Sequence, residues 1–374
     1  MSVFDELIGQ THIIETLSGA VKAANSGEEN QEMTHAWIFT GPPGSGRSSA
    51  AISFAQSLIC KTSGCGSCND CITAKSGAHS DVEILKSEGL SIKIDEVREL
   101  LTRIAWAPSM GGWRVVVMED ADRLTESAAN ALLKAIEEPG LRTVWLLCAP
   151  TLHDILPTIR SRCRHIQLHT PSNNEVSQFL VTKHQIAPKM ADFAARVSQG
   201  HIGRARHLAT NEAVRNRRSA ILAIPNQLTS ISNAFAAAAK LVEIANEESS
   251  AISEQLDEKE YEALSTALGK GGGKALKELE KEQKSRATRI TRDTLDGALL
   301  DLVTFYRDVL LVQSGHGDAL INEELSDQIR KLAENTVSAK TLAKIDAIMK
   351  ARENLQRNGA PLLVMEALMC ELIK

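Results

Sequence analysis

A glycine-rich segment near the start of the chain, GPPGSGRS from Gly41 onward, has the residue types that hold phosphate groups. Glycines let backbone N–H groups turn toward an anion, and a helix that begins there adds positive potential. The segment fits the phosphate-loop pattern G-x-x-x-x-G-K-[ST] at Gly41, Gly46 and Ser48, with Gly44 as a third loop glycine, and the hydroxyl of Ser48 is the group that would bind Mg²⁺. Arg47, however, stands where the pattern has lysine, and arginine is bulkier and forked. The motif predicts a phosphate-loop ancestry and leaves open whether ATP and Mg²⁺ still bind.

A second segment, VVVMEDAD at residues 115–122, ends an apolar run with carboxylates. A nucleotide hydrolase usually has an aspartate for magnesium at this place, followed by a glutamate that orients the attacking water. Here the order is Glu119 and then Asp120, and Asp120 is one methylene shorter than the expected glutamate. We interpret the pair as an altered magnesium motif; the alternative is a polar strand end without function.

Four of the seven cysteines, Cys60, Cys65, Cys68 and Cys71, have the spacing C-x4-C-x2-C-x2-C. Four thiolates at such spacing can close a tetrahedral Zn²⁺ site with no open position for water. We therefore expect a structural zinc ion rather than a catalytic one. The alternative is four unliganded thiols in a loop.

The segment TIRSRCRHI at residues 158–166 carries three arginines, Arg160, Arg162 and Arg164. Taken alone, such arginines usually pair with acids on the protein surface. Their significance depends on the elements around them.

Short apolar runs alternate with helical patterns in the first part of the chain. We expect strands at residues 36–40, 81–85, 114–120, 143–149 and 164–168, and helices at residues 94–106 and from Thr125 as N-cap to residue 138. Buried runs separated by helices predict an α/β fold with a parallel sheet.

The sequence predicts three regions. Residues 1–170 form the α/β phosphate-loop module with the cysteine knuckle inserted, residues 171–208 a small helical domain, and residues 209–374 an all-helical domain. Heptad-like patterns such as residues 295–311 support the last, and residues 269–273 indicate a turn between two helices.

The composition excludes several classes of protein. The 374-residue chain has a net charge of −5, so a broad basic surface for nucleic acid is not expected and any DNA contact should be local or shared. No N-terminal signal and no apolar run of about 18 residues is present, so we expect a cytoplasmic protein with no membrane partner.

Together these motifs resemble, in order and spacing over residues 1–170, the gamma/tau and delta-prime family of bacterial clamp-loader subunits. The segments that carry the resemblance are HAWIFTGPPG, the cysteine knuckle, VVVMEDADRLT, NALLKAIEEP and LPTIRSRC. The resemblance implies an AAA+ module, a helical lid and a helical collar. It also implies a complex with gamma/tau-type and delta-type subunits of DNA polymerase III, which opens the sliding clamp and places it on primed DNA.

In that family the arginine of Ser-Arg-Cys reaches into the ATP site of a neighbouring subunit, which implies that role for Arg162. Several departures point to the delta-prime branch. Arg47 and the Glu119-Asp120 order weaken the chain's own site, and Gly203 in GHIGRA stands where an active relative has a sensor arginine. The nearby Arg204 and Arg206 could replace it in part.

Three functions stay open at this point. The first is a trigger subunit that hydrolyses no ATP of its own and supplies Arg162 in trans. The second is an active gamma/tau-like ATPase that tolerates Arg47. The third is a zinc-stabilised adaptor with no role at ATP sites.

Overall fold

The computed structural model describes residues 2–26, 32–86, 91–105, 108–109, 112–268 and 273–373. Its contacts separate two compact units, Met1–Thr210 and Asn211–Lys374. The finer division of the first unit at residue 170 stays a prediction.

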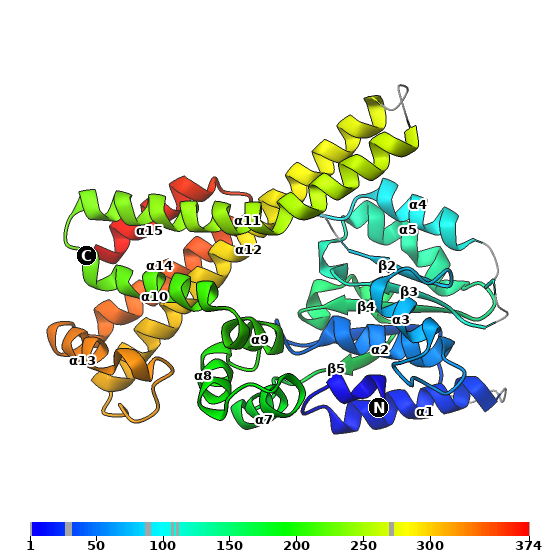
Figure 1. Cartoon of the computed structure of the whole chain (residues 1–374), viewed down its shortest axis with the longest axis horizontal. Coiled ribbons are helices and arrows are strands. Elements are labelled where there is room, and N and C mark those ends of the chain that lie inside the picture. Colours follow the sequence, from blue (N-terminus) through cyan, green and yellow to red (C-terminus); the bar gives the residue numbers. More distant parts are fainter. Residues whose placement is uncertain are drawn as a thin grey trace. The chain divides into compact units, whose positions relative to one another are not determined.

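The first unit is built around a five-stranded parallel sheet (Figure 1). The strand order is β2-β3-β4-β1-β5. The strands are β1 (Ala36–Thr40), β2 (Val82–Leu85), β3 (Arg114–Met118), β4 (Thr143–Ala149) and β5 (Arg164–Gln167). All five strands expected from sequence are present, which confirms the α/β class. Three of them are shorter than expected. Strand β2 starts after Asp81, β3 ends before Glu119 and Asp120, and β5 ends before Leu168.

Helices cover both faces of this sheet. The elements that surround it are η1 (Val3–Glu6), α1 (Thr11–Ser26), α2 (Arg47–Ile59), α3 (Asn69–Ser76), α4 (Ile94–Ile104), η2 (Ala121–Arg123), α5 (Glu126–Glu137), η3 (Leu152–Asp154) and α6 (Pro157–Arg160). Alternate side chains of β1 enter different cores: Trp37 and Phe39 belong to the cluster that contains Phe54 of α2, whereas Ile38 belongs to the cluster that contains Leu132 of α5. Every residue of β1, β3 and β4 is buried, as expected for a sheet covered on both faces.

The predicted boundaries of the two helices on the α4 and α5 side need small corrections. Helix α4 ends at Ile104, and Trp106 lies outside the described residues. Thr125 does cap α5, since its hydroxyl accepts the N–H of Ala128 at 3.3 Å. Helix α5 ends at Glu137, one residue before the expected end.

Three short helices, α7 (Asn173–His184), α8 (Pro188–Ser198) and α9 (Ile202–Thr210), complete the first unit. Helix α7 begins with a capping box, in which the Ser172 hydroxyl accepts the Glu175 N–H and the Glu175 carboxylate accepts the Ser172 N–H. Pro188 begins α8, where its missing N–H costs nothing. These helices form the region expected as a lid.

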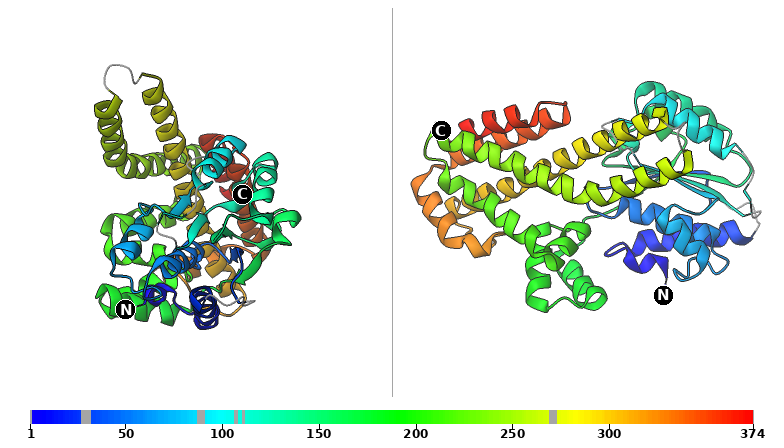
Figure 2. Two further views of the ribbon diagram at one scale, coloured as in Figure 1. Left: turned by 90° about the vertical axis from the view of Figure 1, so that its right-hand side faces the viewer. Right: turned by 45° about the horizontal axis from the view of Figure 1, so that its top comes forward.

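The second unit is entirely helical in its described residues. Its elements are α10 (Glu212–Gln227), α11 (Ile231–Leu268), α12 (Gly273–Gln313), η5 (Glu323–Leu325), α13 (Ser326–Asn335), α14 (Ser338–Gln356) and α15 (Pro361–Ile373). Helices α11 and α12 run antiparallel side by side in all views (Figures 1 and 2). Residues 269–272 of the expected turn lie outside the described residues, and Gly273 begins α12.

The core of the second unit gathers apolar faces of α10–α15 around buried side chains such as Phe305 and Met369. One buried charge is fully engaged there. Arg218 donates to Asp301 Oδ1 at 3.0 Å and to Glu324 Oε1 at 3.0 Å, and it also donates to Asn322. A paired and hydrogen-bonded arginine of this kind fixes how helices meet, since leaving either charge alone would be costly.

Candidate nucleotide, metal and arginine sites

The phosphate loop joins β1 to α2, as its sequence predicts. Gly46 is the N-cap of α2, and its φ of 91° lies in the left-handed region that favours glycine. Gly41 donates its N–H to the carbonyl of Pro150, at the end of the neighbouring β4, at 3.1 Å. The hydroxyl of Ser45 is buried and has no hydrogen-bond partner among the described residues. The loop thus joins a buried strand to the N-terminus of a helix, as the phosphate-loop pattern predicts.

Arg47 is engaged within its own loop. Its Nη1 donates to the carbonyl oxygen of Gly41 at 2.8 Å. A lysine offers a compact charge at the tip of a flexible chain, whereas the planar guanidinium is directional, and here one of its donors is already used. Arg47 keeps its charge but directs one of its N–H donors into the loop instead of toward a phosphate.

The lid contacts this loop through His201, which sequence analysis missed. A Cβ placed on Gly44, whose φ is 83°, would lie 2.2 Å from Cγ of His201, so only glycine fits beneath the ring. His201 Nδ1 accepts the N–H of Arg204 at 3.2 Å, at the start of α9. Burial, followed by the charge of Arg204, lowers the pKa of His201, so the ring is neutral near pH 7.

A cavity of about 460 Å³ lies between the loop and the lid. Gly203 and Arg206 both line this cavity. Gly203 is the residue predicted to replace a sensor arginine. Arg204 is not among the lining residues. Of the two arginines that could replace the sensor, the fold therefore brings Arg206 to the loop.

The carboxylates after β3 do not form an ordinary magnesium motif. Glu119 Oε1 lies 2.9 Å from Lys86 Nζ, so its charge is already paired. Asp120 is the N-cap of η2. Asp122, two residues further on, was missed from the sequence: burial raises its pKa, and the neighbouring Asp120 raises it further, while Arg47 opposes the shift. Glu119 is thus held by a lysine, and Asp122 is a partly desolvated carboxyl.

The four cysteines meet at one point, as their spacing predicts. The sulfur atoms of Cys60, Cys65, Cys68 and Cys71 lie within 4.8 Å of one another. Cys60 Sγ is 3.8 Å from Cys65 Sγ and 3.7 Å from Cys68 Sγ. Tetrahedral Zn–S bonds of about 2.3 Å place sulfurs about 3.8 Å apart, so the cluster has the size that a zinc ion requires.

Backbone N–H groups point at two of the sulfur atoms, while burial raises the pKa of Cys71. The N–H of Cys68 points to Cys65 Sγ at 3.3 Å, and the N–H of Cys71 points to Cys68 Sγ at 3.4 Å. Hydrogen bonds from the backbone of Ser67 and Cys68 lower the pKa of Cys65 to about 5. The cluster is also tied to the N-terminus, since Val3 donates its N–H to the carbonyl of Gly64 at 3.0 Å. These four residues fit a closed metal site.

Arg162 lies at the amino ends of the strands, whereas the phosphate loop lies at their carboxyl ends. Strands β1 and β5 are parallel, with Trp37 paired to Arg164 and Thr40 to Gln167. Arg162 therefore precedes the amino end of β5, whereas Gly41 follows the carboxyl end of β1. At about 3.3 Å per residue, the length of β1 separates them by more than about 13 Å. Arg162 cannot serve the chain's own loop.

The side chain of Arg162 is 39% exposed and forms an ion pair with Glu137, Nη2 to Oε1 at 2.7 Å. The two neighbouring arginines differ from it. Arg164 Nη1 donates to the carbonyl of Glu32 at 2.7 Å, and its guanidinium lies 4.8 Å over the ring of Trp37. Arg160 is the last residue of α6. Arg162 thus pairs with an acid on the protein surface, whereas Arg164 is held by a backbone carbonyl and an aromatic ring.

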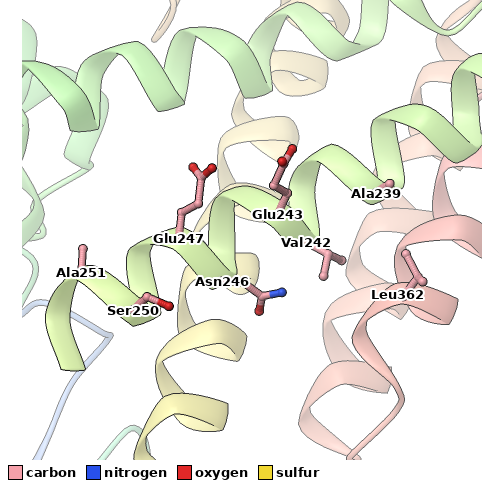
Figure 3. Close-up of a pocket in the computed structure, with 8 residues that line it drawn as sticks. All are labelled: Ala239, Val242, Glu243, Asn246, Glu247, Ser250, Ala251 and Leu362. Carbon is pink, nitrogen blue, oxygen red and sulfur yellow. The ribbon is translucent and has the colours of Figure 1, made fainter. Parts of the chain in front are cut away.

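The second unit has a groove of about 780 Å³ along α11. Its lining residues are Ala239, Val242, Glu243, Asn246, Glu247, Ser250, Ala251 and Leu362 (Figure 3). Figure 3 shows the carboxylates of Glu243 and Glu247 on one side of α11 and Val242 and Asn246 on another. The groove thus combines two acidic side chains with small and apolar ones.

Two family models match the chain. The model described as DNA polymerase III, delta subunit, matches residues 17–172, and that described as DNA polymerase III, delta subunit, C terminal, matches residues 258–372. Together they cover about seven-tenths of the chain. The chain belongs to the DNA polymerase III delta-subunit family. Within the described ranges, every helix is too short or too polar to span a lipid bilayer.

Individual relatives agree with this membership. The DNA polymerase III subunit delta' of Bacillus subtilis is 25% identical, with 88% of each chain covered. The subunit delta' of Pseudomonas aeruginosa is 38% identical over 34% of this chain and 41% of its own. The subunit gamma/tau of Mycobacterium tuberculosis is 33% identical, but only 43% of this chain and 28% of that longer protein are covered.

Solved structures give weaker similarities. A DNA polymerase III gamma subunit-related protein of Thermotoga maritima has a TM-score of 0.39 at 18% identity, covering 91% of this chain and 99% of that chain. A RuvB of the same organism has a TM-score of 0.41 at 20% identity, covering 58% and 65%. The family membership rests on the sequence matches and not on these scores.

Proposed function

We propose that this chain acts as a delta-prime-type subunit of a DNA polymerase III clamp loader and supplies Arg162 to the ATP site of a neighbouring subunit. The observation that carries the proposal is the position of Arg162. It is exposed at the amino ends of the strands, remote from the chain's own loop, where a second subunit can approach. The gamma/tau-type and delta-type subunits of the family are the proposed partners, with the sliding clamp and primed DNA reached through the complex.

The chemistry expected of Arg162 is electrostatic. Negative charge spreads over the oxygens of the γ-phosphate during its transfer, and a guanidinium supplied from a second protein stabilises that charge. Arginine can donate two parallel hydrogen bonds to such oxygens, which a lysine cannot. Arg162 would thus complete the ATP site of the neighbouring subunit.

The cysteine cluster is proposed to hold Zn²⁺. Four sulfur ligands at tetrahedral separations favour zinc over harder cations such as Mg²⁺. When bound, the ion would supply structural cross-linking between the end of α2 and the start of α3, and it would take no part in ATP hydrolysis.

We expect the isolated chain to hydrolyse ATP no faster than the buffer background. Arg47 is bonded to Gly41, Glu119 is paired with Lys86, and no arginine stands at Gly203, so three separate parts of the site are weakened. Arg47→Lys alone should not restore activity. The measurement is phosphate release by the purified chain. Turnover well above background that disappears on Ser48→Ala would favour the active-ATPase alternative instead.

We further expect the second unit to hold the chain in the complex. It has its own buried core, and it exposes large apolar side chains such as Ile231 (66%), Phe235 (46%) and Leu363 (66%). Clusters of exposed apolar side chains are typical of interaction surfaces. A chain ending at Thr210 should therefore remain folded, by circular dichroism, but elute apart from the other subunits in size-exclusion chromatography. Co-elution of the truncated chain with the complex would contradict this role.

A further inference from the structure

The segment ANALLKAIEEP contributes to the family resemblance but has no role in the function proposed above. It lies in α5, whose last residue is Glu137. We propose that Glu137 is the residue that positions Arg162 for its action on the neighbouring subunit. The inference rests on the proposed trans role of Arg162, and it assigns a second residue to that role.

Three contacts fix the orientation of the guanidinium. Arg162 Nη1 donates to the carbonyl of Thr158 at 2.7 Å and to the hydroxyl of Ser161 at 3.1 Å. Arg162 Nη2 lies 2.7 Å from Glu137 Oε1. Thr158 and Ser161 belong to the same short segment as the arginine. Glu137 belongs to α5, so its contact fixes the position of the arginine relative to the rest of the module.

These contacts leave part of the guanidinium available. Arginine has five N–H donors, of which three are used here. The Nε–H and one N–H of Nη2 have no partner among the residues that the structure describes. Two donors therefore stay open for phosphate oxygens of a neighbour while the side chain is held.

The position of Glu137 favours a role in placing Arg162 over a role in stabilising the fold. A helix C-terminus carries partial negative charge, so an acid in the last turn is unfavourable unless a cation lies beside it. Glu137 is 44% exposed and Arg162 39%, and ion pairs at such exposure contribute little to stability. The benefit of the pair is therefore the placement of the arginine.

Arg162 is surrounded by other positive charges. Arg142, Arg162 and Arg164 line one cavity of about 470 Å³ beside β4 and β5. Like charges repel one another, so Arg162 without an acidic neighbour is driven away from this wall. Glu137 offsets that repulsion and keeps the side chain of Arg162 at the amino end of β5.

The test uses the full chain in a reconstituted loader, with clamp and primed DNA present. Glu137→Gln should lower kcat for ATP, and this loss should be at least about half of the loss in kcat that Arg162→Ala causes. The reason is that misplacing a catalytic group slows chemistry without weakening substrate binding. The KM for ATP should change little. The matched control is Glu138→Gln, which removes a neighbouring exposed carboxylate and should leave kcat unchanged.

A double variant separates positioning from other roles. Adding Glu137→Gln to Arg162→Ala should cause no further loss, since Glu137 acts only through the arginine. Glu137→Asp, which keeps the charge, should retain more activity than Glu137→Gln. If Arg162→Ala slows the loader and Glu137→Gln does not, the positioning role is wrong and the trans role stands. Faster turnover of Glu137→Gln, or a further loss in the double variant, also overturns it. If Arg162→Ala has no effect, the proposed function itself fails.

Discussion

Arg162→Ala is expected to lower the clamp- and DNA-stimulated ATP turnover of the assembled loader several-fold while the complex stays intact. An arginine supplied in trans contributes roughly 10³–10⁵ in rate at a single site in GTPases. A loader has several ATP sites, so the loss in total turnover should be smaller than that. The measurement is steady-state phosphate release, with assembly checked by size-exclusion chromatography.

Two further variants serve as controls. Arg162→Lys should rescue poorly, because a point charge does not replace the fork of the guanidinium. Arg160→Ala should leave turnover close to that of the unaltered loader, since Arg160 ends α6 and has no part in the proposed site. Arg164 is a poor control, because it also packs on Trp37. Equal effects at Arg160 and Arg162 would argue for a general loss of positive charge.

The second large effect is expected at the cysteine cluster. Protein purified without chelator should contain about one zinc ion per chain, and Cys65→Ser with Cys68→Ser should abolish it. Because metal binding contributes directly to folding free energy, the midpoint of thermal unfolding should fall by about 5–10 °C. Metal content by atomic emission and thermal unfolding by calorimetry are the two measurements.

Cys370→Ser is the matched control for the zinc prediction. Cys370 is a free, partly buried cysteine in the second unit, remote in sequence from the cluster, so its replacement should leave the zinc content unchanged. Metal-free wild-type protein would show that the cluster is merely a group of thiols. Unaltered zinc content in the double serine variant would place the metal elsewhere.

Features whose residues are close in sequence could be predicted before the structure. The cysteine cluster is set by four residues within twelve positions and by tight turns such as the one at Gly64, where a Cβ would lie 2.7 Å from Val3. The five strands followed from apolar runs, because a strand buried on both faces must be apolar at every position. The cap at Thr125 followed from a local hydrogen bond.

Contacts between distant segments could not be predicted in this way. His201 meets Gly44 across most of the first unit's sequence, and no local pattern relates a lid histidine to a loop glycine. Glu137 and Arg162 belong to different elements and were singled out for separate reasons. Asp122 was overlooked because its burial, which raises its pKa, is a property of the packed fold.

The trans role of Arg162 is tested most directly in a loader in which only the ATPase subunit next to this chain can hydrolyse ATP. Phosphate release then reports a single site, with no contribution from the others. We expect Arg162→Ala to reduce this turnover by about 1,000-fold, the lower end of the range for arginines supplied in trans, and to leave ATP binding to that subunit unchanged. Unchanged turnover at that site would contradict the account and favour a zinc-stabilised adaptor with no role in ATP hydrolysis.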